Sequence, residues 1–254
     1  MRHGGRVAVA LTAALLGMVL AGCGRAGYGE DAYSGLETVP EKLGSDGTTI
    51  TVGDPQAPVT VHLYEDPRCP VCEEFESTGG GPELREATVR GETKTEYTMA
   101  SFLDDRLGGS GSKKAVNALR AALAQGRFAE YHQVLYRHQP EESEDGFTDA
   151  RLLELAEQVD GLRGPAFDSA VKGMKYKAFV AASEKAYEDA GGSAQPGGPG
   201  TPTAVINTVR IPADYNGVLF DDSVFANLLR EIRLEPEDWE DYVFPELATT
   251  PGPF

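Results

Sequence analysis

The sequence has few cysteines and few basic residues, and each shortage excludes a class of protein. Three cysteines among 254 residues are too few for a scaffold held together by disulfides. The 23 lysines and arginines face 40 aspartates and glutamates, which gives a net charge of −17. Such a charge disfavours nucleic acid or an anionic lipid surface as an electrostatic partner. Because 41% of the residues are hydrophobic, a folded core is expected and wholesale disorder is excluded.

Long apolar runs are also scarce, and the clearest one lies near the N-terminus at residues 7–20. It is shorter than the roughly 20 residues that a membrane-spanning helix needs, and basic residues precede it. Both features are typical of a secretory signal peptide. The run ends in Leu-Ala-Gly-Cys at residues 20–23, which resembles the bacterial lipobox. We therefore predict a signal peptide at residues 1–22 and lipidation of Cys23; the alternative is an ordinary signal peptide with a chance cysteine.

Composition divides the rest of the chain into three parts. Residues 23–47 are rich in glycine and acidic residues and lack an apolar period, which predicts a flexible tether after the lipid-bearing cysteine. Residues 48–234 carry the apolar patterns of a folded domain, with an all-helical insertion at about residues 113–190. Residues 235–254 form an acidic tail that contains proline. We expect one domain between two terminal extensions.

The period of the apolar residues predicts the main strands and helices. Strands are expected at residues 50–52, 59–64, 93–102 and 203–207, and a loop at residues 108–112. Helices outside the insertion are expected at residues 83–89 and 223–233, and the insertion should end in a helix at residues 178–190. In the last helix of the chain, Val224, Leu228 and Ile232 are predicted to face the core.

The two remaining cysteines, Cys69 and Cys72, stand in the sequence Cys-Pro-Val-Cys directly after a predicted strand. Pro70 and the glutamates that follow are favoured in the first turn of a helix, so the pair should begin one. A helix N-terminus stabilises a thiolate, which is the attacking species in disulfide exchange. We therefore predict that Cys69 is the nucleophile and that Cys72 resolves the mixed disulfide.

The cysteine pair has two other interpretations, a zinc site and a static structural bridge. A zinc site needs further cysteine or histidine ligands at matching spacing, but the sequence has no second Cys-x-x-Cys and its histidines do not cluster. No metal site is therefore expected. A static structural bridge between Cys69 and Cys72 remains open, because an oxidising compartment outside the membrane would also favour it.

Three regions of the sequence resemble DsbA-like thioredoxin-fold proteins. They are residues 53–72, which end in the cysteine pair, residues 125–132, and the sequence Gly-Thr-Pro-Thr at residues 200–203. The resemblance spans about residues 48–233. It implies an α/β protein with a thioredoxin-like fold, in which a central mixed β-sheet carries an inserted all-helical subdomain. It also implies thiol–disulfide oxidoreductase activity.

The resemblance further implies a substrate site and a set of partners. Thr201 and Pro202 would form a cis-proline loop that faces the cysteines and binds an extended substrate segment. The substrates would be secreted proteins that contain cysteine, and an unidentified redox partner would reset the pair, with no cofactor. The enzyme would be extracytoplasmic and held at the membrane by lipidated Cys23, with its redox direction undecided. The alternative is a non-catalytic lipoprotein that binds a partner and keeps a static disulfide.

Two departures from the family pattern bear on redox strength. Leu63 occupies the strand position, six residues before Cys69, where related proteins often have an acidic residue. Val71 replaces the histidine of the strongly oxidising members, and it can offer the thiolate neither a hydrogen bond nor a charge. We expect Glu65 and Asp66 to be exposed carboxylates of the loop before the pair. We therefore expect a less oxidising pair than in those members.

We expect ordinary structural roles for the remaining polar and aromatic residues. Arg68 is expected to be solvated, and His132 to be a surface or packing residue of a helix. His62 should lie on the less buried face of its strand. Trp239 in the tail is expected to pack on the domain.

Overall fold

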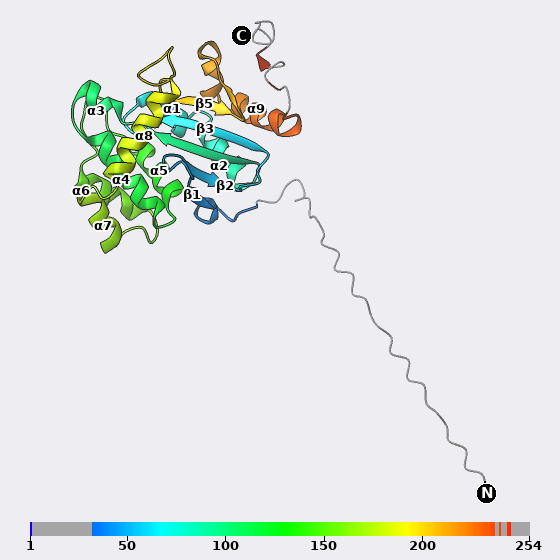
Figure 1. The fold of residues 1–254 in the computed structure, drawn as a ribbon, viewed down its shortest axis with the longest axis horizontal. Coiled ribbons are helices and arrows are strands. Elements are labelled where there is room, and N and C mark those ends of the chain that lie inside the picture. Colours follow the sequence, from blue (N-terminus) through cyan, green and yellow to red (C-terminus); the bar gives the residue numbers. More distant parts are fainter. Residues whose placement is uncertain (2–31, 237–238, 240–242, 245–254) are drawn as a thin grey trace. The chain divides into compact units, whose positions relative to one another are not determined.

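The computed structural model describes residues 1, 32–236, 239 and 243–244, which build a six-stranded mixed β-sheet (Figure 1). The strands are β1 Glu41–Leu43, β2 Ile50–Gly53, β3 Val59–Glu65, β4 Thr93–Met99, β5 Thr203–Ile206 and β6 Val209–Arg210. Their order is β1-β2-β4-β3-β5-β6, and only β3 and β4 pair in parallel. The predicted α/β class with a central mixed sheet is confirmed.

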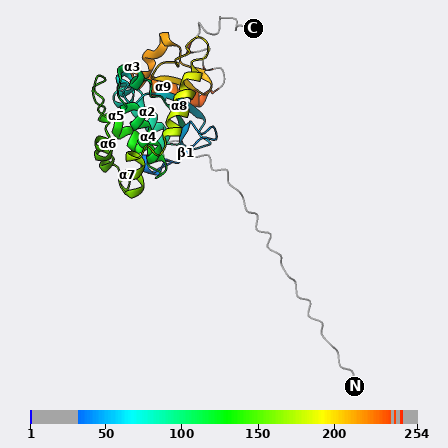
Figure 2. The same cartoon turned by 60° about the vertical axis from the view of Figure 1, so that its left-hand side comes forward.

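Helices pack against this sheet, and six α-helices of the described part of the chain come between β4 and β5. The α-helices are α1 Pro70–Ser77, α2 Gly81–Val89, α3 Phe102–Leu107, α4 Gly111–Leu123, α5 Phe128–Arg137, α6 Asp149–Leu155, α7 Pro165–Lys172, α8 Lys177–Ala190 and α9 Asp222–Leu234. Short 3-10 helices lie at η1 Leu36–Thr38, η2 Ala156–Gln158 and η3 Ala213–Leu219. Figures 1 and 2 both show α4, α6 and α7 gathered at one side of the domain. In the described ranges, no helix combines the length and the apolar character needed to cross a bilayer.

Side chains alternate between the two faces of strand β3, and this alternation positions residues of the candidate active site. Val59, Val61, Leu63 and Glu65 are all buried on one face, whereas the residues between them are half-buried. On the other face, Tyr64 contacts Tyr187 of α8, with ring centroids 6.5 Å apart. His62 is half-buried on that face, as predicted. Because side chains alternate along a strand, Glu65 points into the same interior as the apolar residues before it.

Helices α1 and α9 pack together beside that interior. Phe75 of α1 meets Phe225 of α9 edge to face, with ring centroids 5.8 Å apart. A single apolar core contains residues of the sheet, of α9 and of the helices between β4 and β5. The helical region is therefore packed into the same core as the sheet.

The described residues form regular structure earlier in the chain than predicted. Strand β1 pairs with β2, with Glu41 opposite Val52, and the side chain of Val39 is buried. Glu41 also accepts hydrogen bonds from the backbone of Phe128 and Ala129, which are unpaired donors at the start of α5. The prediction of a flexible tether at residues 23–47 is therefore wrong for residues 36–43. This segment has no apolar period, but strand pairing with β2 and the hydrogen bonds of Glu41 to the start of α5 hold it in place. Residues 2–31, with the predicted signal peptide and Cys23, lie outside the described residues.

Three further expectations differ from the structure. The strand predicted at residues 93–102 ends at Met99, and Phe102 begins α3. The loop predicted at residues 108–112 already contains the start of α4. In α9, Val224 is 47% exposed, and the buried face instead begins at Phe225. The reason is that Asp221 accepts a hydrogen bond from the Val224 N–H, which places Val224 in the solvent-facing first turn.

The described part of the tail includes the single tryptophan. Trp239 is 3% exposed, and its ring centroid lies 5.8 Å from that of Phe244. The predicted packing role of Trp239 is confirmed. Most other residues of the predicted tail lie outside the described residues.

Candidate active site

The cysteine pair stands at the N-terminus of α1, directly after β3. Cys69 is the residue that precedes the helix and Pro70 is its first residue, as the sequence predicts. Cys69 is 7% exposed and Cys72 is fully buried, and both are free thiols. Val71 between them is 42% exposed. The first cysteine is thus the one that a substrate can reach.

The two thiols have opposite ionisation preferences. The pKa of Cys69 is lowered to about 6, first by a hydrogen bond from Cys72 and further by the Thr201 side chain and by backbone N–H groups of α1, against the effect of burial. Burial raises the pKa of Cys72 well above its ordinary value. At neutral pH Cys69 is therefore a thiolate and Cys72 a thiol, which is the division of roles that disulfide exchange requires.

The loop before β5 faces Cys69. The Thr201–Pro202 bond is cis, and the Cys69 sulfur lies 3.4 Å from the Thr201 carbonyl oxygen, to which it donates a hydrogen bond when it is protonated. The Thr201 hydroxyl is buried beside the Cys69 sulfur. A groove of about 410 Å³ opens here, with a wall that includes Cys69, Val71, Phe102, Tyr187 and Thr201. The structure thus brings together Cys69 and Thr201, which are 132 positions apart in the sequence.

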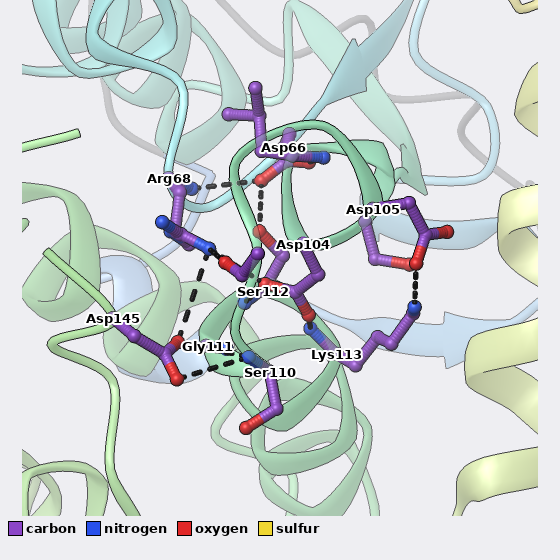
Figure 3. A network of polar contacts seen from close by, with 12 residues as sticks. Asp66, Arg68, Asp104, Asp105, Ser110, Gly111, Ser112, Lys113 and Asp145 are labelled. Atoms are coloured by element: carbon purple, nitrogen blue, oxygen red, sulfur yellow. Dashed lines mark hydrogen bonds and ion pairs between the residues drawn. The ribbon is translucent and has the colours of Figure 1, made fainter. Parts of the chain in front are cut away.

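Arg68, which precedes the pair, is buried rather than solvated. Figure 3 shows its side chain among Asp104, Ser112 and Asp145. Its guanidinium donates to Asp104 at 2.9 Å, to the Gly108 carbonyl at 2.9 Å and to the Glu142 carbonyl at 3.1 Å. The expectation of a solvated side chain is wrong, because a carboxylate and two carbonyl groups accept the hydrogen bonds that water would accept from an exposed guanidinium. Arg68 therefore ties the cysteine loop to α3 and to the loop that follows α5.

Two buried carboxylates complete this network. Asp104 accepts hydrogen bonds from the first backbone N–H groups of α4. Asp66 accepts from the backbone N–H groups of Arg68 and Leu103 and from the Ser112 hydroxyl, at 2.6 Å. Asp66 is fully buried, and that burial raises its pKa to about 7. The expectation of an exposed loop carboxylate at Asp66 is therefore wrong.

A second polar cluster lies behind Cys72. Glu65 at the end of β3 is fully buried, contrary to expectation, and it lies 3.0 Å from Nε2 of His132. Glu76 of α1 is also buried and forms an ion pair with Arg85 of α2. His132 is 2% exposed and contacts Tyr97, with ring centroids 4.7 Å apart. The predicted packing role of His132 is therefore incomplete, because its ring also forms a hydrogen bond with Glu65.

Burial dominates the ionisation of this cluster. It raises the pKa of Glu65 to about 8 and that of Glu76 to about 7. It lowers the pKa of His132 to about 4, so the imidazole is neutral at physiological pH. A carboxyl group that binds its proton near neutral pH is suited to exchange that proton with a nearby thiol.

The same cluster is the candidate metal site among the described residues. Glu65, Glu76 and His132 offer ligand atoms that all lie within 4.8 Å of one another. However, the Arg85 guanidinium already bonds the Glu76 side chain and backbone carbonyl. Arg85 thus provides the positive charge that a metal ion would bring.

Glu65, Glu76 and His132 were not predicted as site residues, although the sequence pattern of two of them indicates a buried position. Glu65 continues the alternation of Val61 and Leu63, which places it on the buried face of β3. Glu76 lies four residues after Cys72 and so shares its helix face. His132 carried no comparable signal, because only the fold brings α5 against the end of β3.

Comparison with known proteins agrees with this geometry. The family model described as Thioredoxin matches residues 45–218. BdbD from Bacillus subtilis has a TM-score of 0.60 and 20% identity, over 81% of this chain and 100% of that one. MdbA, a thiol-disulfide oxidoreductase from Corynebacterium diphtheriae, has a TM-score of 0.59 and 19% identity, over 80% and 96%. DsbA from Chlamydia trachomatis has a TM-score of 0.57 and 21% identity, over 72% and 91%. No curated protein matched the sequence.

The family match covers most of the chain and contains both the cysteine pair and the cis-proline loop. The solved structures share the arrangement of sheet and helices over nearly their whole length. The chain therefore belongs to the thioredoxin family, and its fold is that of the DsbA-like proteins within it.

Proposed function

We propose that the protein is a membrane-anchored, extracytoplasmic thiol–disulfide oxidoreductase that acts on secreted proteins through Cys69 and Cys72. The observation that carries the proposal is the opposite ionisation of the two thiols, with the thiolate of Cys69 at the groove and the thiol of Cys72 in the interior. Membership of the thioredoxin family supports the same reaction class. A static bridge needs neither a stabilised thiolate nor a groove beside it.

The reaction requires two exchanges of sulfur. In the reducing direction, the Cys69 thiolate attacks one sulfur of a substrate disulfide, and the other substrate sulfur leaves as a thiolate. Cys72 then loses its proton and attacks Cys69, which forms the enzyme disulfide and releases the second substrate thiolate. Oxidation of a substrate dithiol runs through the same steps in reverse. A redox partner then returns the pair to its starting state, and no cofactor is required.

The groove provides a place for the substrate chain during both exchanges. Thr201 presents its carbonyl and its hydroxyl beside Cys69, and the exposed side chain of Val71 lies on the same wall. An extended segment that pairs with the backbone of Thr201 would bring its own cysteine to Cys69. The function therefore predicts covalent capture of substrates at Cys69.

This capture can be tested with the two single cysteine variants. The Cys72→Ala variant should accumulate mixed disulfides with secreted proteins, because the intermediate has no internal thiol to release it. The Cys69→Ala variant is the matched control and should accumulate few. Non-reducing electrophoresis followed by mass spectrometry identifies the captured cysteines. Equal capture by both variants, or capture by neither, would contradict the proposed roles.

A further inference from the structure

Arg106 of α3 carries an exposed positive charge on the wall of the groove at Cys69. Its guanidinium carbon lies 5.1 Å from the ring centroid of Phe102, which stands one turn earlier on the same helix. Phe102 in turn packs against the buried cluster that contains Cys69 and Cys72. A guanidinium that lies over an aromatic face keeps N–H groups at its edge that can still donate hydrogen bonds. The contact with Phe102 therefore fixes the charge of Arg106 relative to the cysteine pair.

A second aromatic contact connects Phe102 to the cis-proline loop. The rings of Phe102 and Tyr187 of α8 are stacked, with centroids 5.4 Å apart and an angle of 10° between their planes. The Tyr187 hydroxyl accepts a hydrogen bond of 3.2 Å from the Gly200 N–H, in the loop before β5. Arg106, Phe102 and Tyr187 thus form a continuous wall from α3 to the loop that carries Thr201.

Arg106 forms no ion pair within the described part of the chain, although the sequence has 40 acidic residues. Its neighbour Asp105 pairs instead with Lys113, at 2.7 Å. Glu184 of α8 accepts hydrogen bonds from the backbone and the hydroxyl of Ser101, the residue before α3. The acidic groups nearest to Arg106 in sequence and in the packed helix are therefore held by other donors, and its guanidinium is available to a carboxylate of another molecule.

We propose that Arg106 recognises a carboxylate of the substrate, so that the groove selects cysteines with an aspartate or glutamate nearby. The proposal rests on the proposed function, because the groove must first take up a substrate cysteine. In an extended segment, side chains two positions apart point to the same side and lie about 7 Å apart. An acidic residue two positions from the substrate cysteine would therefore face the same wall as that cysteine. A guanidinium binds such a carboxylate through two parallel hydrogen bonds.

The lining of the groove also includes an acidic side chain, that of Glu142 in the loop after α5. Arg68 holds the backbone carbonyl of Glu142 at 3.1 Å, but no described residue bonds its carboxylate. Arg106 is fixed over Phe102, whereas the side chain of Glu142 is exposed and unsupported. A side chain that is already fixed loses less conformational entropy on binding. Arg106 rather than Glu142 therefore determines which charge the groove selects.

Thiol exchange with short peptides measures this selection. Cys69 of the Cys72→Ala variant is first joined to thionitrobenzoate in a mixed disulfide. A peptide thiolate then attacks the Cys69 sulfur, the peptide becomes bonded to Cys69, and the coloured thionitrobenzoate thiolate leaves. Mass spectrometry verifies that the peptide is bonded to Cys69. The peptides contain one cysteine, with glutamate, glutamine or lysine two positions away on both sides. Each rate is divided by the rate of the same peptide with free dithiobis-nitrobenzoate, which corrects for the pKa of the peptide thiol.

We expect the glutamate peptide to react about fivefold faster than the glutamine peptide, and the lysine peptide to be the slowest. Arg106→Gln should abolish this preference, and Arg106→Glu should reverse it, so that the lysine peptide becomes the fastest. Arg230→Gln is the matched control, since it removes an exposed arginine of α9 that does not line the groove. This control should leave the preference unchanged.

The three peptides test the proposal even before residue 106 is changed. Equal corrected rates, or a preference for glutamate that survives in Arg106→Gln, would overturn the assignment to Arg106. A lysine peptide that is the fastest while Arg106 is present would transfer the selection to Glu142 and would also overturn it. A mixed disulfide at Cys69 that no peptide thiol exchanges would overturn the proposed function itself.

Discussion

At the scale of single residues, Val71 limits how strongly the site stabilises its thiolate. The donors to Cys69 are Cys72, Thr201 and backbone N–H groups, and the exposed side chain at position 71 adds none. A histidine there would place a charge-assisted donor beside the thiolate, which would stabilise the reduced form. The wild-type pair should therefore be less oxidising than the strongest family members, which have potentials near about −120 mV.

The Val71→His variant tests this prediction. We expect its reduction potential to rise by a few tens of millivolts, because about 30 mV corresponds to 1.4 kcal/mol in a two-electron couple. The pKa of Cys69, which is lowered to about 6 in the wild type, should fall further in the same variant, and the pH dependence of alkylation measures it. Equilibration with glutathione measures the potential. A wild-type potential already at the strong-oxidant value, or a variant that changes neither quantity, would contradict the prediction.

Individual residues also show how far the site could be predicted. Cys69, Cys72, Thr201 and Pro202 were named because their motifs are local in the sequence, and the structure places Thr201 beside Cys69. The buried state of Arg68 could not be predicted in the same way. Its partners come from residues 104, 108 and 142, and only the fold brings these to one point. Long-range polar contacts of this kind leave no period in the sequence.

At the scale of elements, the start of α4 is joined to the cysteine loop through Asp104. This carboxylate caps the helix and pairs with Arg68, whose side chain is 1% exposed. Removing one partner of a buried ion pair leaves the other without compensation. We therefore expect Arg68→Ala to lower the free energy of unfolding by about 3–5 kcal/mol, as measured by chemical denaturation.

The neighbouring ion pair of Lys113 and Asp105 provides the control for this prediction. The side chain of Lys113 is 38% exposed and that of Asp105 is 74% exposed. Lys113→Ala should therefore cost at most about 1 kcal/mol. Equal losses in the two variants would show that burial of Arg68 does not determine its contribution.

Helices and strands with a clear apolar period were predicted well, whereas short elements without such a period were not. Strand β3 and helix α8 were placed within two residues of their ends, because each carries a continuous buried stripe. Strand β1 was missed because its three residues, Glu41–Leu43, gain their order from pairing with β2. Helix α3 was missed because Phe102, its first residue, lies three positions after the end of β4 and extends the apolar character of that strand. Short elements thus depend on partners that the local sequence does not show.

At the scale of the whole molecule, the N-terminal pattern predicts lipid attachment at Cys23. The expected mature chain begins at this cysteine and carries a diacylglycerol thioether. Intact-mass spectrometry of the protein from its native host measures the modification, and Cys23→Ser should abolish it and release the domain from membranes. A mature chain that begins elsewhere, or an unmodified Cys23, would contradict the prediction.

The first described contact of the N-terminal segment with the domain bears on the reach of the proposed lipid anchor. The Tyr33 N–H donates to the Val89 carbonyl at 3.1 Å, so the chain is fastened to the domain ten residues after Cys23. Ten residues span at most about 35 Å, whereas a tether that continued to residue 47 would span about 80 Å. If Cys23 carries the predicted lipid, the domain is therefore confined to a layer close to the bilayer surface. Its clients would be chains that are still emerging from the membrane, rather than proteins already released from it.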